Sequence, residues 1–229
     1  MAVDEVLLES AAHGEIALRM YQWSGPTLSL GYFQSSAERQ QHTPSLGCPL
    51  VRRASGGGAI LHDRELTYSF AAPAGTRNWH DHRGLVDLFH GALIEALADW
   101  GLVGRLCPPE ESRRYPREPF LCFARRAAGD LLVGDAKIAG SAQRRSRGAV
   151  LQHGSVLVDV SPHAPELIGL AQLANRPVDV TQLAARWRES LAAATGWQLR
   201  PAGLDAQQRQ RAAELAESRY GRAEWNHRR

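Results

Sequence analysis

The sequence predicts an α+β fold, a single domain over residues 1–229 in which a mostly antiparallel sheet is flanked by helices. Two observations support this prediction. Strand-like and helix-like segments follow one another in mixed order, with short turns between strands and helices grouped beside them, as is typical of α+β proteins. The chain contains no long Ser/Gly/Pro linker, repeat or low-complexity tract, and its length suits one large domain.

The first third of the chain predicts one helix followed by strands. Apolar residues recur at helical spacing over 2–12, whereas 16–23 alternates and leads into a Ser-Gly-Pro turn. Residues 27–33 indicate a further strand. Region 49–73 has two apolar segments on either side of a glycine loop, followed by the alternating run LTYSF. We therefore expect a hairpin-like arrangement there.

The rest of the chain predicts a long helix, a hairpin and two more helices. The clearest helix covers 84–100, with a regular apolar face and Gly101 as a stop. Residues 130–145 indicate a hairpin that turns at Gly134, and 149–160 indicates a strand pair or one bent strand. The two further helices are expected at 180–196 and 205–221.

The composition is that of an ordinary globular protein, with 44% hydrophobic and 22% charged residues. The net charge is only +3 and no dense basic run contains aromatic residues, so we expect no nucleic-acid partner, although a basic rim would equally steer an acidic protein. No segment approaches 18 apolar residues or resembles a signal peptide, and the three cysteines lack metal-ligand spacing. We expect a soluble, cytoplasmic protein with no metal site and no membrane association.

Lys137 is the only lysine among the 27 Lys and Arg residues. Arg is a planar fork that stays charged, whereas Lys is a compact point charge on a thin stem. A lone lysine in an arginine-rich chain therefore indicates a position that arginine cannot serve. The plain alternative is a chance survivor on a solvated face. Its small neighbours in KIAGSA favour function, because they let a ligand approach the backbone closely.

A glycine loop forms a second candidate site. Gly56, Gly57 and Gly58 follow Arg52 and Arg53 directly, and consecutive glycines usually mark unusual dihedrals or close ligand approach. Backbone N–H groups in such a loop can hold an anion or a carbonyl oxygen. The spacing matches neither phosphate-loop motif, and a plain flexible hairpin loop is the alternative.

Cys122 and two histidines complete the candidate residues. Cys122 lies in the apolar stretch EPFLCF. It is either a buried, inert thiol or, if a cation such as Lys137 lies beside it, a nucleophile. His62, followed by Asp63, is either catalytic or half of a structural pair. His153, in the segment LQHGS, is placed to line the same cleft.

The segments RRASGGGAILHDRELTYSF, KIAGSAQ, LQHGSVLVD and EWNHRR resemble the lipoate-protein ligase and octanoyltransferase family, which is related in fold to the biotin-protein ligases. AVDEVLLES and PTLSLGYFQ resemble it as well, so the resemblance covers essentially the whole chain. It implies the biotin/lipoate-protein-ligase fold in one catalytic domain over 1–229, without the accessory C-terminal domain of many bacterial ligases.

This family contains two chemistries. Ligases activate lipoate with ATP to an acyl-adenylate, whereas transferases move octanoyl from acyl carrier protein through a cysteine thioester. Cys122, fifteen residues before Lys137, is similar to the nucleophile position of the cysteine-type transferases, and HDRELTYSF also resembles them. The run SGGG is closer to the ligases. On balance the resemblance implies a cysteine-type octanoyltransferase in which Cys122 and Lys137 are catalytic.

The implied reaction takes octanoyl from octanoyl-acyl carrier protein to a lysine of a lipoyl domain, as in glycine cleavage H protein or a 2-oxoacid dehydrogenase E2. It uses no cofactor; ATP and magnesium would be needed only by a ligase. The alternatives are an ATP-dependent lipoate ligase, acyl transfer between lipoyl domains, and a non-catalytic acyl- or partner-binding module. The substrate-binding residues are expected to be Arg53, Ser55, Gly56, Gly57, Gly58, Ala59, His62, Gly140, Ser141, Ala142, His153 and Gly154, with Ala59, Leu61 and Ala142 lining an acyl tunnel.

Overall fold

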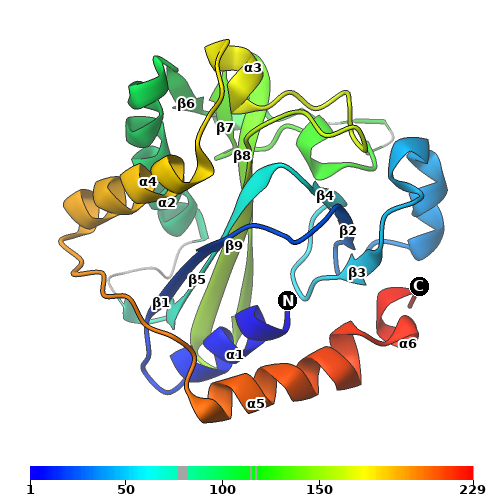
Figure 1. Ribbon diagram of the computed structural model, residues 1–229, viewed down its shortest axis with the longest axis vertical. Helices are drawn as coiled ribbons and strands as arrows, with labels where there is room; N and C mark the ends of the chain where they lie inside the picture. Colours follow the sequence, from blue (N-terminus) through cyan, green and yellow to red (C-terminus); the bar gives the residue numbers. More distant parts are fainter. Residues whose placement is uncertain (77–81, 114, 117, 229) are drawn as a thin grey trace.

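The computed structural model describes residues 1–76, 82–113, 115, 116 and 118–228 (Figure 1). Its centre is an antiparallel six-stranded sheet, and a three-stranded sheet lies beside it. The large sheet contains, from edge to edge, β1 (Ala17–Tyr21), β5 (Glu65–Pro73), β9 (Ala149–Leu157), β8 (Ala136–Ser146), β7 (Leu131–Val133) and β6 (Gly104–Leu106); the small sheet contains β3 (Leu50–Arg52), β2 (Thr27–Leu30) and β4 (Ile60–His62). The predicted α+β class with a mostly antiparallel sheet is confirmed.

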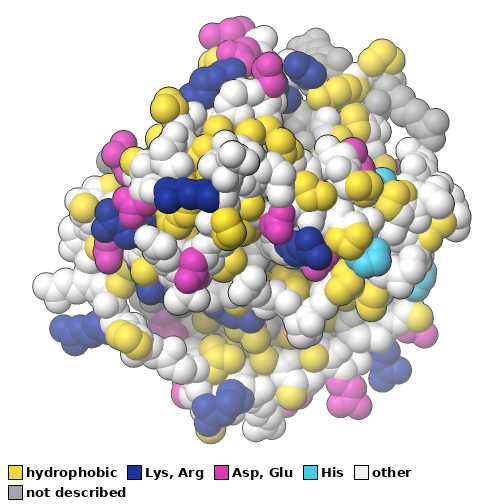
Figure 2. All heavy atoms as spheres, turned by 45° about the horizontal axis from the view of Figure 1, so that its top comes forward, with side chains coloured by type: hydrophobic (Ala, Val, Ile, Leu, Met, Phe, Trp, Pro, Cys, Tyr) yellow, Lys and Arg dark blue, Asp and Glu magenta, His cyan; other side chains and the backbone are white. Residues whose placement is uncertain are grey.

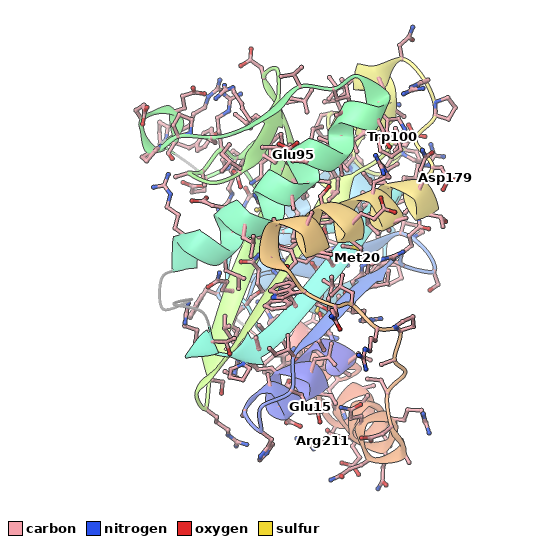
Figure 3. All side chains as sticks on the ribbon, turned by 90° about the vertical axis from the view of Figure 1, so that its left-hand side faces the viewer. Glu15, Met20, Glu95, Trp100, Asp179 and Arg211 are labelled. Carbon is pink, nitrogen blue, oxygen red and sulfur yellow. The ribbon has the colours of Figure 1, made fainter. Side chains whose placement is uncertain are left out.

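Helices pack on both faces of the large sheet (Figure 1). One face carries α2 and α4, which lie side by side in Figure 3, with the region of Trp100 after α2 close to Asp179 at the start of α4. The other face carries α1, and α5 packs against α1. No helix in the described part of the chain is long and apolar enough to cross a membrane. The helices are α1 (Ala2–Ala11), α2 (His82–Leu97), α3 (Leu170–Ala174), α4 (Val180–Thr195), α5 (Ala206–Leu215) and α6 (Ala223–Asn226).

Alternation along β5 divides the large sheet into an apolar face and a more polar one. Tyr68 and Phe70 point into the main core beneath α2 and α4, where the Tyr68 ring contacts Trp187 and the Phe70 ring contacts Phe89. Thr67 and Ser69 point to the opposite face, because successive side chains of a strand alternate. Since α1 covers only part of that second face, the remainder is available for a binding site.

Region 49–73 does not form the predicted hairpin. The strands on either side of the glycine loop, β3 and β4, are separated by β2, which pairs parallel with β3 and antiparallel with β4. The next strand, β5, belongs to the large sheet. The glycine loop therefore crosses from one edge of the small sheet to the other, and Gly57 has a left-handed φ of +92° that favours glycine.

The other predicted elements agree with the structure to within a few residues. β7 and β8 form the predicted hairpin, which turns at Gly134 with φ +56°, and 149–160 contains one strand, β9. The helix predicted at 84–100 continues beyond α2 as a 3₁₀ turn and stops at Gly101, which is left-handed. The prediction for 205–221 is met by α5 followed by a π-helical turn.

Candidate active site

A cavity of about 320 Å³ lies between the more polar face of the large sheet, the glycine loop and the segment that follows Cys122. Its volume is in the range of small-ligand sites. It gathers residues that are far apart in sequence, as the resemblance implied. The expected site residues that line it are Arg53, Gly56, Gly57, Gly58, His62, Cys122, Lys137, Gly140, Ser141, Ala142, His153 and Gly154.

Cys122 and Lys137 meet at one wall of this cavity. Cys122 begins a 3₁₀ turn over Cys122–Ala124, and its N–H donates to the Ala59 carbonyl at 2.7 Å, which fixes the turn beside the glycine loop. Lys137 Nζ lies 3.2 Å from Cys122 O and 3.9 Å from Cys122 Sγ. Lys137 belongs to the β7–β8 hairpin and Cys122 to the 3₁₀ turn that precedes it, so the two residues meet from different elements. Cys122 is partly exposed to the cavity.

The ammonium of Lys137 also contacts a buried carboxylate. Lys137 Nζ lies 2.8 Å from Asp130 Oδ2. Burial lowers the pKa of Lys137, but the neighbouring Cys122 and Asp130 raise it by more, so the net pKa lies above its ordinary value and the group is a cation. Arg53 and Arg125 also line the cavity beside Cys122. The positively charged side chains Lys137, Arg53 and Arg125 therefore line the same cavity as the thiol, a setting typical of reactive cysteines.

Arg53 holds the glycine loop in place. Its guanidinium donates to the Gly56 carbonyl at 2.8 Å and to the Gly58 carbonyl at 2.6 Å, and burial lowers its pKa to about 10. A Cβ on Gly58 would lie 2.8 Å from Arg125 Cζ, so a larger residue there would displace a cation from the cavity wall. The loop forms one wall of the cavity and does not connect the two strands of a hairpin, and its role in binding stays a prediction.

Both histidines of the cavity have their ring nitrogens engaged by neighbours. His62 contacts Ser29 Oγ through Nε2 at 2.8 Å and Glu65 Oε1 through Nδ1 at 2.6 Å, so it belongs to a buried network. His153 Nε2 contacts Ser55 Oγ at 2.5 Å, and burial lowers the pKa of His153 despite a nearby carboxylate. Both rings shape the cavity, and the geometry presents neither as a free base.

The registers of the large sheet define the cavity floor. Gly140 pairs with Ser155, Ser155 with Thr67, and Thr67 with Tyr21. All four residues line the cavity, so the floor crosses β8, β9, β5 and β1 in one row. Three strand spacings of about 4.8 Å make this row roughly 14 Å long. It starts beside Lys137 and ends at Tyr21, whose ring is held by the Arg19 guanidinium at 3.6 Å.

Three expected residues lie outside the cavity lining, and one lines it differently. Ser55 is buried behind His153, where its hydroxyl orients that ring. Leu61 on β4 and Ala59 just before it are buried in the core beside the small sheet, and Ala59 contributes through its backbone contacts to the Cys122 turn. These side chains therefore do not line an acyl tunnel. Ser141 lines the cavity, but its hydroxyl bonds the Tyr68 hydroxyl within the sheet's core face.

Comparison with known proteins identifies the family. The model of the lipoyl protein ligase A/B catalytic domain matches residues 1–189. The chain belongs to this family. An octanoyltransferase LipM from Kyrpidia tusciae is 33% identical over 260 aligned residues, which cover 100% of this chain and 93% of the relative. A second octanoyltransferase LipM, from Staphylococcus aureus, is 37% identical over 169 residues, or 70% of this chain and 61% of the relative. The family expected from the motifs is confirmed.

Solved structures of lipoate-protein ligases share the fold. A lipoate-protein ligase A bound with ATP superposes with a TM-score of 0.77 at 22% identity, covering 99% of this chain and 92% of the other. A bipartite lipoate protein ligase with its E2 lipoyl domain, from Thermoplasma acidophilum, gives a TM-score of 0.77 at 20% identity, covering 99% and 89%. The lipoate-protein-ligase fold predicted from the sequence is therefore confirmed.

Several cavity residues of this lipoyl protein ligase A/B family member escaped the sequence analysis. Asp130 immediately precedes β7. In the predicted hairpin it lies on the arm opposite Lys137, and this position is the sequence feature that indicates a contact between the two. Arg125 gave no signal beyond its membership of an arginine pair. Tyr21 and Thr67 lie on predicted strands. They are neighbours only because β1 pairs with β5, and local alternation of residues does not predict which strands pair.

Proposed function

We propose that this lipoyl protein ligase A/B family member transfers an octanoyl group from octanoyl-acyl carrier protein to a lysine of a lipoyl domain, through a thioester on Cys122. The observation that carries the proposal is the Lys137 ammonium 3.9 Å from the Cys122 thiol, at the head of a groove across the sheet. Relatives that cover the whole chain bear the name octanoyltransferase, which supports the same reaction.

In the first half-reaction the Cys122 thiolate attacks the carbonyl carbon of the donor thioester. The carbonyl oxygen becomes an oxyanion, for which Lys137 and the N–H groups of Gly57 and Gly58 are the proposed partners. Collapse of this intermediate breaks the donor's C–S bond, and the carrier leaves as a thiolate that takes up the proton lost from Cys122. The acyl chain then lies along the floor row that ends at Tyr21.

In the second half-reaction the amine of the acceptor lysine attacks the thioester on Cys122. The C–N bond forms, the C–S bond breaks, and Cys122 is regenerated as a thiol with the proton that the amine loses. Dividing the transfer into two steps is the usual advantage of covalent catalysis. The acceptor proposed here is a lipoyl domain, in keeping with the E2 lipoyl domain that accompanies the Thermoplasma ligase. The reaction requires neither ATP nor a metal ion.

The test is acylation of a purified lipoyl domain, with and without ATP and magnesium. Octanoyl-acyl carrier protein should be the donor in one arm, and free octanoate or lipoate in the other. We expect transfer from the carrier protein without nucleotide, detected as a mass increase of the lipoyl domain. A strict requirement for ATP together with a free acid would contradict the proposal and indicate a ligase. Binding of the acyl group with no transfer would indicate a non-catalytic module.

A further inference from the structure

Asp130 is a buried carboxylate that none of the steps above uses. Its Oδ2 lies 2.8 Å from Lys137 Nζ, and both side chains are almost completely enclosed. Burial raises the pKa of Asp130, while the Lys137 ammonium opposes that rise. Burying a charged pair costs desolvation free energy that the pairing seldom exceeds, so stability alone is a weak reason for its presence.

The carboxylate fixes the direction of the ammonium. Lys137 Nζ has three N–H bonds, and its neighbours are Asp130 Oδ2 at 2.8 Å, Cys122 O at 3.2 Å and Cys122 Sγ at 3.9 Å. A lysine side chain otherwise has several rotatable bonds and nearly 2 kcal/mol of rotamer entropy to lose. With Asp130 on one side and Cys122 on the other, the ammonium is held between carboxylate and thiol.

Asp130 is itself held by the backbone. Its Oδ2 accepts the Ala127 N–H at 2.7 Å, and its carbonyl accepts the Cys107 N–H at 2.7 Å. Gly140 closes the opposite side, because a Cβ there would lie 2.8 Å from Lys137 Cε and 3.3 Å from Asp130 Oδ1. The position of the carboxylate is thus set by the fold and does not depend on Lys137.

We propose that Asp130 is a positioning residue for the transfer reaction, holding the Lys137 ammonium against Cys122 and the acyl carbonyl. This inference rests on the proposed octanoyl transfer. Asp130 has two opposite effects on the reaction, one through its charge and one through its position beside Lys137. Asp130 is negative, so on charge alone it disfavours negative charge at Cys122 Sγ during reaction, whereas its effect on the direction of Lys137 favours transfer.

The substitution Asp130→Asn separates the two effects. The amide oxygen of Asn can still accept the Ala127 N–H, but the negative charge that anchors Lys137 is gone. We expect iodoacetamide to alkylate Cys122 at least as fast as in the wild type. We expect kcat for octanoyl transfer to fall roughly 10- to 100-fold, because misplacement by about 1 Å has that effect on rate. KM for the donor should change less than about threefold, since the lost interaction acts on the transition state.

Two further variants make the test specific. Asp130→Glu keeps the charge but moves the carboxylate, so it should not restore kcat. Asp99→Asn breaks an ion pair with Arg186 outside the cavity and should leave both rates unchanged. Wild-type kcat in Asp130→Asn or in Asp130→Glu would overturn the inference, as would a parallel loss of alkylation and transfer with a lower melting temperature. Absence of transfer by the wild-type enzyme is a different result, which would overturn the proposed function itself.

Discussion

Replacing Lys137 by Ala should reduce acyl transfer more than it reduces the reactivity of the Cys122 thiol. At the observed 3.9 Å, a unit charge pair interacts by about 4 kcal/mol at an effective dielectric constant near 20. Asp130 lies 2.8 Å from the same ammonium and cancels part of its field. The remaining attraction of about 2 kcal/mol acts on negative charge at Cys122 Sγ, so its loss slows alkylation by at most about 30-fold. Because only part of that charge is present in the alkylation transition state, we expect a decrease of about fivefold.

Acyl transfer should fall by roughly 100-fold or more in Lys137→Ala, because the variant also loses a proposed partner of the oxyanion. Lys137→Arg keeps the charge, but the space beside Gly140 is already filled by the lysine stem, so the wider guanidinium should not restore turnover. The assay measures iodoacetamide alkylation of Cys122 by mass spectrometry and octanoyl transfer to a lipoyl domain. Full turnover in Lys137→Arg would refute the inference that this position needs lysine. Equal alkylation rates in all three proteins would show that the ammonium does not act on the thiol.

Three further predictions follow from the packing. Gly140→Ala should displace Lys137 and lower kcat about tenfold, with little change in stability. In Gly154→Ala the new Cβ would lie 2.4 Å from a backbone oxygen, so the unfolding free energy measured in urea should fall by about 1–3 kcal/mol. Equal changes of stability in the two variants would contradict this prediction. Burial lowers the pKa of His90 from 6.5 to about 4. The neutral ring therefore contributes fully to the free energy of unfolding above pH 6.5, and roughly 3 kcal/mol of it is lost as the pH falls toward 4. In urea unfolding of His90→Gln this pH-dependent loss of stability should be absent. Tyr21→Ala should lengthen the groove, so that each added methylene of a longer acyl donor raises kcat/KM about fourfold; an unchanged chain-length profile would exclude Tyr21 as the end of the groove.

The sequence predicts the local elements well, because helices and hairpins depend on neighbouring residues. The helical period and Gly101 predict α2 and its end, and the turn at Gly134 predicts the β7–β8 hairpin. The sequence does not predict the pairing of the strands around the glycine loop, because this pairing involves a strand outside the region. β3 pairs parallel with β2 and β4 pairs antiparallel with it, and no residue between β3 and β4 indicates this arrangement. The cavity lining is observed, and the catalytic and binding roles of its residues stay predictions.

Sequence motifs predict part of the candidate site. Contacts that depend on how distant segments meet in the fold are not predictable from those motifs. Cys122 and Lys137 were chosen from family-like segments and the rarity of lysine, but their contact depends on a turn held by the Ala59 carbonyl. The roles of Ala59 and Leu61 were misjudged because strand alternation alone did not reveal that β4 lies in a second sheet.

On the face shown in Figure 2, basic side chains lie among acidic ones and do not form one patch. The absence of a nucleic-acid partner stays a prediction.

The most direct test of the central claim is the intact mass of the protein after incubation with octanoyl-acyl carrier protein. One octanoyl adduct is expected, located on Cys122 by peptide mapping, released by hydroxylamine and absent from Cys122→Ser. The other two thiols are poor competitors, because both are buried and burial raises the pKa of Cys48 and of Cys107. An adduct of equal yield on Cys48 or Cys107, or acylation of the lipoyl domain at the wild-type rate by Cys122→Ser, would contradict the assignment of Cys122 as the nucleophile.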